Sequence, residues 1–432
     1  MSTEKTNSLS LWAAVIINLN IIIGSGVFIN TTELAKRAGL LGGLCYVIVG
    51  LLLFPLILSF VRLLQLYPSG GFYAFCSTSI HPLVGFLSTW SYFFAKLSSG
   101  TLAVHIFTLL AQKTFPVLTC VSPVAFDMII VSLLLALNML NVRTGSKIQN
   151  WLMVLKLSPI LLVIASGFLL IQSGNLTPVH QLWEGIPSAI PLVLHALLGF
   201  EVACAISRNI ENPEVNGPRS ILISYGIVMI LYMLYQGFFY GILGDKLAQA
   251  ADYRGAFPLL ISTFNISDQL RNFLGHFIHL AIALSALSAA FGIIYANLWN
   301  LYALAEQHHT IAPKAIMQRN RFNIPFMCVL AQGAIMITYL CIMDQQTTFQ
   351  QLSAFGTTIT YALSIAGLCA TLYHQKKSML LPILGFINCA LLLTVALFAM
   401  WKTNNPIPLY IFIGIISSGI IMYGISQHHK KD

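Results

Sequence analysis

Hydrophobic residues gather into twelve long apolar segments separated by short polar connections. A helix needs about 20 mostly apolar residues to cross the ~30 Å hydrocarbon core of a bilayer. Most of the segments have this length, whereas strands of a membrane β-barrel alternate in hydrophobicity over about 10 residues. We therefore predict an all-α, polytopic membrane protein. The segments run approximately over Leu11–Asn30, Leu40–Leu66, Leu83–Ala111, Val124–Leu140, Asn150–Gln172, Ile186–Asn209, Ser220–Leu243, Asn272–Glu306, Pro325–Met343, Leu352–Tyr373, Leu380–Trp401 and Pro406–Ser426.

The first apolar segment is predicted to remain in the protein as a helix. Its basic region is the single residue Lys5, and no small-residue cleavage site follows, so the pattern of a signal peptide is lacking. Lys and Arg are more numerous in the connections on the N-terminal side of the membrane than in those on the opposite side. By the positive-inside rule, this bias favours a cytoplasmic location for both termini.

The composition excludes several classes of protein. Hydrophobic residues make up 57% of the chain and charged residues 8%, whereas soluble domains carry about 25% charged residues. A soluble enzyme, a nucleic-acid-binding protein and a disordered chain are therefore excluded, despite a net charge of +9. None of the eight cysteines belongs to a CxxC pair, so we expect neither a disulfide framework nor a metal site. We interpret residues 1–432 as a single membrane domain.

The first segment contains a glycine-rich triplet, Gly24-Ser25-Gly26, in the middle of its apolar run. Two glycines weaken a helix, and unwound backbone at membrane depth is tolerated where it lines a cavity. An interruption there would present free amides to an anion and free carbonyls to a cation. Together these groups match a zwitterionic amino acid. A close contact between packed helices is the alternative use of the triplet.

The sixth segment contains a second candidate interruption at Leu198-Gly199-Phe200-Glu201. A carboxylate within a membrane span is expensive, so Glu201 is a functional candidate, with a structural tether between helices as the alternative. The interruptions fall in segments 1 and 6, which hold the same place in two blocks of five. Paired interruptions at corresponding positions of two repeats indicate a transporter site at the repeat interface.

Four ordered motifs make the chain similar to the amino acid–polyamine–organocation (APC) superfamily, with its permeases and antiporters. They are Ile23–Phe28, which resembles the first-helix glycine motif; Tyr67–Phe75, which resembles YPxxGGxYxY with one residue fewer; Gly199–Glu201 with Glu211–Pro213 and Pro218-Arg219; and Tyr302–Ala305 with Ala312-Pro313. The resemblance implies two inverted five-helix repeats, at about residues 10–175 and 180–375, with helices 1 and 6 discontinuous. Two extra helices would follow at about residues 378–426.

The resemblance also implies a substrate site. In the family, backbone at the two interruptions holds the carboxylate and the amino group of the substrate. Here His195 falls at the place of an aromatic lid that is Trp in some members, and Tyr295 at the place of a substrate-facing aromatic. The resemblance implies Ile23, Gly24, Ser25, Gly26, His195, Ala196, Leu198, Gly199 and Tyr295 as substrate-binding residues. To these we add Lys96 and Ser99, which share a face of the third segment, as candidates that shape side-chain selectivity.

Two lysines within the segments are candidates for coupling or selectivity. Lys156 resembles a lysine of proton-coupled members whose ammonium group replaces a sodium ion between helices 1 and 8; snorkelling to the membrane surface is the alternative. Lys96 shares a helical face with Tyr92 and Ser99. It could pair with Glu201, contact a substrate carboxylate or repel cationic substrates. We assign coupling or gating to Lys156 and Glu201.

These observations favour a secondary transporter for amino acids or related amines in the cytoplasmic (inner or plasma) membrane. Proton-coupled symport and exchange by an antiporter stay open, as do the substrate and the choice between monomer and homodimer. No cofactor is expected. A membrane-embedded enzyme would need an acid–base or metal constellation that the spacing of these residues does not offer. A passive channel would need rings of like charge or a filter motif.

Overall fold

The computed structural model describes residues 8–140, 142–177, 182–343 and 345–428. Within these ranges the regular secondary structure is helical, and the two β-type pairings, Leu9 with Ile210 and Arg319 with Pro325, are isolated bridges. The all-α prediction is confirmed. The α-helices are α1 (Leu11–Ile22), α2 (Gly26–Ala38), α3 (Gly42–Leu66), α4 (Gly71–Ser77), α5 (Pro82–Thr114), α6 (Pro123–Asn138), α7 (Val142–Leu170), α8 (Leu182–Leu197), α9 (Val202–Ala205), α10 (Pro213–Leu243), α11 (Asp245–Gln249), α12 (Tyr253–Ser262), α13 (Asp268–Glu306), α14 (Pro313–Ile316), α15 (Phe326–Ile342), α16 (Gln346–His374), α17 (Leu380–Thr403) and α18 (Ile407–His428).

Nine helical segments of the described residues are long and apolar enough to cross a membrane, judged by length and composition. Three apolar helices are shorter: α1, α6 and α15. The predicted arrangement of twelve spans in two repeats therefore stays a prediction. Helix α10 begins at Pro213, earlier than the apolar segment, because proline is well suited to the first helical position and Asn212 before it takes a positive φ of 46°.

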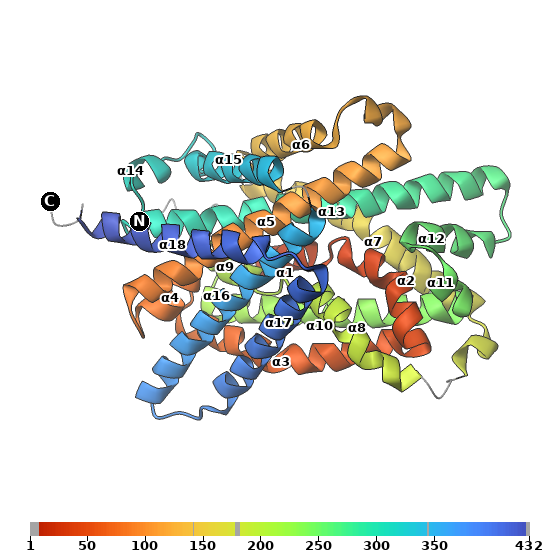
Figure 1. Ribbon diagram of the computed structural model, residues 1–432, viewed down its shortest axis with the longest axis horizontal. Coiled ribbons are helices and arrows are strands. Elements are labelled where there is room, and N and C mark those ends of the chain that lie inside the picture. The colour runs from red at the N-terminus through yellow and green to blue at the C-terminus, as the bar shows by residue number, and fades with distance from the viewer. Residues whose placement is uncertain (1–7, 141, 178–181, 344, 429–432) are drawn as a thin grey trace.

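The long helices α5 and α13 lie across the centre of the molecule (Figure 1). Helix α5 packs against α13 and α16, and α3 packs against α10. Many large apolar side chains are instead exposed on the peripheral helices, including Leu133 of α6, Phe398 of α17 and Ile421 of α18. An exposed apolar surface of this extent is expected where helices face lipid, so the polytopic arrangement accounts for it.

Both predicted interruptions coincide with helix ends. Helix α1 ends at Ile22 and α2 begins at Gly26, so the triplet separates two helices. Helix α8 ends at Leu197 and the short α9 begins at Val202. Between them, Gly199 has a φ of +115°, a conformation that side-chain-bearing residues rarely adopt. Glycines therefore account locally for the break in the helix at each interruption.

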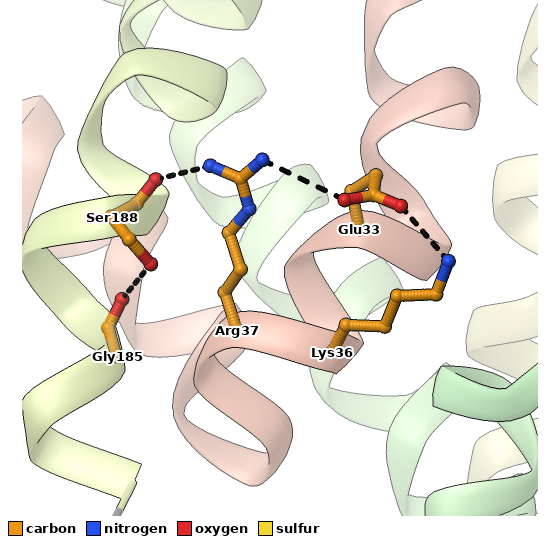
Figure 2. A network of polar contacts seen from close by, with 5 residues as sticks. All are labelled: Glu33, Lys36, Arg37, Gly185 and Ser188. Atoms are coloured by element: carbon orange, nitrogen blue, oxygen red, sulfur yellow. Dashed lines mark hydrogen bonds and ion pairs between the residues drawn. The ribbon is translucent and has the colours of Figure 1, made fainter.

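Helices α2 and α8, which follow and precede the two interruptions, are fastened to each other (Figure 2). Arg37 donates a hydrogen bond of 2.6 Å to the carbonyl of Ser188, and it lies 3.6 Å from the carboxylate of Glu33. Glu33 also accepts a hydrogen bond of 2.9 Å from Lys36. Nearer the interruptions, Asn30 donates one of 2.8 Å to the carbonyl of Leu192. The hydrogen bonds from Arg37 and Asn30 hold α2 against α8.

Gly185 permits the close approach of these two helices, so we expect Gly185→Ala to destabilise the protein. A Cβ atom at this position would lie 1.6 Å from the backbone oxygen of Arg37, and backbone cannot turn aside as a flexible side chain can. Overpacking of this kind typically costs about 1–3 kcal/mol. Thermal unfolding in detergent measures the effect. Gly174→Ala, where a Cβ atom would meet nothing within 4 Å, is the matched control, and equal stability of the two variants would contradict the expectation.

Candidate functional site

A cavity of about 170 Å³ lies between the two helix interruptions. Its walls come from the interruptions themselves and from α5, α13 and α16. Most of the predicted substrate-binding residues line it, namely Gly24, Ser25, Gly26, Lys96, Ser99, His195, Ala196, Leu198 and Gly199. The structure therefore brings together predicted residues from three separate stretches of the sequence.

Two predicted substrate-binding residues, Ile23 and Tyr295, lie outside this lining. The side chain of Ile23 is fully buried, and its contribution is a backbone carbonyl that faces a lysine, as described below. On α13 the cavity is lined by Ala286, Ala289 and Ile293, which recur at helical spacing. Tyr295 is two residues beyond Ile293, so it projects from a different face of the helix, where it is also buried.

The end of α1 is capped by Lys156 of α7. Its Nζ donates hydrogen bonds of 2.7 Å to the carbonyl of Asn20 and of 2.7 Å to the carbonyl of Ile23. Lys156 is fully buried, which removes snorkelling as its role. Ser285 of α13 lies 3.5 Å from the same Ile23 carbonyl. An ammonium group thus occupies a position between α1, α7 and α13 where carbonyl oxygens converge.

The start of α2 faces the cavity with backbone amides. The first amides of any helix have no acceptor within that helix, and they carry the positive end of its dipole. In the described structure Ser25, the residue before the helix, makes no side-chain capping bond. Gly26 lies opposite His195 and Ala196, because a Cβ atom built on it would be 3.9 Å from atoms of each. These amides are placed to receive an anionic group.

The side chain of Glu201 accepts a hydrogen bond from the backbone of the second interruption. One carboxylate oxygen accepts a hydrogen bond of 3.0 Å from the amide of Gly199. The other lies 2.6 Å from Nζ of Lys96 and accepts a hydrogen bond of 3.1 Å from the hydroxyl of Tyr92. Glu201 is fully buried, whereas the side chain of Lys96 is 9% exposed and lines the cavity. Of the predicted alternatives, pairing with Glu201 is the one seen for Lys96.

We expect Glu201→Gln to destabilise the protein more than the double variant Lys96→Met/Glu201→Gln. The single substitution leaves a buried ammonium group without its counter-charge, which typically costs about 3–5 kcal/mol, whereas replacing both partners is often nearly neutral. Thermal unfolding of the wild type, both single variants and the double variant forms a complete cycle. Additive effects of the two substitutions would contradict a coupled pair.

Several polar lining residues were not among the predicted site residues: Asn30, Gln350, Ser353 and Thr357. A signal existed for two of them, because Ser353 and Thr357 belong to a polar stripe on one face of their segment. Such a stripe of small polar residues is equally typical of a surface for close helix packing. Sequence alone could not show which end of the stripe meets a cavity and which end meets another helix.

Two further sets of contacts join the segments around Leu9 and Arg208 to distant parts of the chain. Leu9, just before α1, donates a backbone hydrogen bond of 2.6 Å to Asn209 and accepts one of 2.9 Å from Glu211. Arg208 forms an ion pair of 2.6 Å with Glu306 at the end of α13. In Figure 1, α4 and α14 lie at one end of the molecule and α11 and α12 at the opposite end. The cavity lining includes Ile29 and Asn30 of α2 and neither Arg208 nor Glu306.

The arrangement can bind a small zwitterion. The amides at the start of α2 suit a carboxylate, and the carbonyls at the end of α8, which lack N–H donors within the helix, suit an ammonium group. Groups of three or more His, Cys, Asp or Glu that could hold a metal ion are absent among the described residues. The polar side chains of α5 and α16 remain to contact a third part of the ligand.

Comparison with known proteins gives consistent results along the whole chain. The family model "Amino acid permease" matches residues 9–423. An uncharacterized transporter of Mycobacterium tuberculosis is 26% identical, over 90% of this chain and 86% of the relative. The b(0,+)-type amino acid transporter 1 of Rattus norvegicus is 25% identical, over 99% and 91%. The aromatic amino acid transport protein AroP of Escherichia coli is 22% identical, over 95% and 92%.

Proposed function

Because the chain belongs to the amino acid permease family, we propose that it is a secondary active transporter that moves amino acids or related amines across the cytoplasmic membrane by alternating access. Amino acid transport by an integral membrane protein follows from the family itself. The same finding excludes the membrane-embedded enzyme considered above, since the family and its relatives are transporters. The alternating-access mechanism and the particular membrane are the proposal.

One observation carries the proposal: the cavity is bounded by both helix interruptions. A substrate in it would place its carboxylate at the amides of Ser25 and Gly26 and its ammonium group at the carbonyls of Ala196 and Leu198. Both groups would then meet backbone of complementary partial charge. The site would recognise what all amino acids share and leave the side chain to other residues.

In the proposed cycle the two ends of the cavity open alternately. The contacts of Leu9 with Asn209 and Glu211, together with the Arg208–Glu306 pair, would close the cytoplasmic end. With this assignment both termini would lie in the cytoplasm. Helices α2 and α8 are fastened together and would move as one element on the opposite side. The two five-helix repeats, at about residues 10–175 and 180–375, would supply the two halves that move.

Lys156 is the proposed coupling residue. It joins α7 to the last carbonyls of α1, so loss of its proton would weaken both hydrogen bonds at this end of the interruption, because a neutral amine lacks the charge that strengthens them. Burial disfavours the charged form of an ammonium group in general. A change in protonation at this position would therefore change the geometry of the substrate site. Proton-coupled symport uses such a change directly, whereas exchange does not require it.

Reconstitution of the full chain in proteoliposomes tests the proposal. Uptake of labelled amino acids and amines is measured without a gradient, with an inside-alkaline pH gradient, and with unlabelled substrate inside. We expect saturable uptake of at least one amino acid, accelerated by the pH gradient for a symporter or by internal substrate for an exchanger. Flux that rises linearly with concentration would indicate a channel. The absence of uptake for every compound tried would contradict the proposal.

A further inference from the structure

Lys96 stands between a buried carboxylate and the cavity. Its Nζ lies 2.6 Å from Glu201 and 5.3 Å from the centre of the Tyr92 ring. Glu201 is fully buried behind it, whereas Lys96 belongs to the cavity lining. An ammonium group can donate three hydrogen bonds. It can therefore keep its bond to Glu201 and still donate to a ligand in the cavity.

Glu201 fixes the direction of this ammonium group. The same carboxylate accepts hydrogen bonds from the amide of Gly199 and the hydroxyl of Tyr92, so it is held both from the second interruption and from α5. Lys96 is thereby held at the cavity wall near the second interruption, with its charge paired to Glu201. Glu201 acts as a positioning residue, because its own oxygens are already occupied by groups of the protein.

The cavity lining carries a basic residue but no acidic one. Among the residues that line it, all within the described part of the chain, Lys96 is a cation, His195 is titratable and none is Asp or Glu. A cationic side chain placed against Lys96 would meet a like charge in a poorly solvated space, without the backbone carbonyls that are proposed to receive the amino group of the substrate, and this disfavours its binding. A ligand group with a carbonyl or carboxylate oxygen would instead accept a hydrogen bond from Lys96.

Neutral hydrogen-bonding groups surround the lysine on the cavity wall. Ser99 is one helical turn from Lys96 on α5, and Gln350, Ser353 and Thr357 face the cavity from α16. Hydroxyl and amide groups can both donate and accept. These groups can therefore form hydrogen bonds with a ligand whose side chain is polar. An aliphatic or aromatic side chain would leave them without partners.

We propose that Lys96, held by Glu201, selects amino acids whose side chain ends in a carboxylate or carboxamide oxygen, such as glutamate and glutamine, and rejects those with a cationic side chain. This inference rests on the proposed function and names the substrate class of the same site. The common carboxylate and amino groups bind at the interruptions, and the side-chain oxygen binds at Lys96 and Ser99. Lysine, arginine and di-amines would place an ammonium or guanidinium group against Lys96.

The test compares amino acids by two independent measurements on the full chain. Thermal shift of the purified protein in detergent reports binding, since a ligand of the native state raises its apparent stability. Competition against uptake of the labelled substrate in proteoliposomes reports transport. The probes are L-glutamate, L-glutamine, L-lysine, L-arginine and L-leucine. We expect glutamate or glutamine to bind at least about tenfold more tightly than lysine, arginine and leucine, a difference of 1.4 kcal/mol.

A matched variant keeps the test interpretable. Lys96→Met/Glu201→Gln removes both charges together and avoids an unpaired buried carboxylate. We expect it to lose the preference for glutamate or glutamine over leucine. Lys246→Met, at an exposed position on α11, is the charge-matched control and should keep it. Correct folding is checked by size-exclusion elution and by the unfolding transition of each variant.

The outcomes separate the inference from the proposed function. Equal or tighter binding of lysine or arginine by the wild type would overturn the inference while leaving amino acid transport in place. So would a double variant that keeps the wild-type preference. Failure of every amino acid to bind or to be taken up would instead contradict the proposed function, and the inference would fail with it.

Discussion

Gly26→Val is expected to reduce amino acid uptake by about 100-fold while the protein still inserts into the membrane. A Cβ atom at Gly26 would lie 3.9 Å from both the Cα atom of Ala196 and Cδ2 of His195. Valine adds two further methyl groups, and its β-branched side chain is too stiff to turn both aside. They would fill the space beside the first amides of α2. Misplacement of a bound group by about 1 Å can cost about 10² in rate.

Two further variants test whether the effect depends on the size and the position of the side chain. Gly26→Ala adds only the Cβ atom, which would make an ordinary contact at 3.9 Å, so we expect a smaller loss of uptake. Gly226→Val places the same side chain on α10, where a Cβ atom meets nothing within 4 Å, and should transport like the wild type. Initial uptake rates per inserted protein are the measurement. Full transport by Gly26→Val would show that substrate does not pass this position.

Lys156→Met is expected to lower uptake at least about tenfold. The substitution removes both hydrogen bonds that hold the carbonyls of Asn20 and Ile23. Hydrogen bonds to charged groups contribute about 1.5–3 kcal/mol each, and losing the equivalent of one is already more than tenfold in an equilibrium. The end of α1 would then lose its defined geometry beside the cavity. A flattened dependence of uptake on the pH gradient should accompany the loss if the transporter is proton-coupled.

Lys246→Met is the control for this substitution, because it removes an equivalent charge from the exposed surface of α11. Its uptake and its response to the pH gradient should match those of the wild type. Unchanged uptake in Lys156→Met would contradict a role for Lys156 in transport. A variant that fails to insert is recognised by its absence from the membrane fraction, and Lys156→Arg, which retains the charge, then replaces it in the comparison.

Sequence reasoning located the helices well because hydropathy decides them directly. Helix α17, for example, begins at Leu380, as its apolar segment does. The segment boundaries are less well defined where polar residues continue a helix. Helix α7 begins at Val142, before the apolar run that starts near Asn150, since a helix can extend beyond the apolar part of its sequence. The number of spans depends on how the short helices α1, α6 and α15 sit in the bilayer, which length and composition do not decide.

The candidate site could be predicted at residues that are energetically unfavourable within a membrane-spanning helix. Glycines within an apolar run, a carboxylate in a span and two lysines in spans all conflict with a plain membrane helix. The structure places Gly24, Gly26, Lys96 and Glu201 around one cavity or directly behind it. Each had been selected because a membrane helix would otherwise not contain it.

The rest of the site depends on the relative rotation of helices, which leaves little trace in one sequence. Tyr295 and Ile293 are both apolar or aromatic residues of α13, yet only Ile293 lines the cavity. On α16, Ser353 and Thr357 line it, whereas Thr360 further along the stripe donates a hydrogen bond to the carbonyl of Ser88 in α5. Small polar residues serve packing and binding equally well, so their type does not separate the two uses.

Protection of a cysteine at Ser99 tests most directly whether amino acids bind in the cavity between the two interruptions. Ser99→Cys changes the lining little, and the reagent is a small membrane-impermeant thiol reagent, applied with the exposed Cys120 and Cys341 replaced by serine. Gly174→Cys, at an exposed position away from the cavity, is the control. We predict that a transported amino acid at about ten times its Kd slows modification of Ser99→Cys about tenfold and leaves Gly174→Cys unchanged. Modification of Ser99→Cys at the same rate with and without the transported amino acid would contradict a substrate site at this cavity.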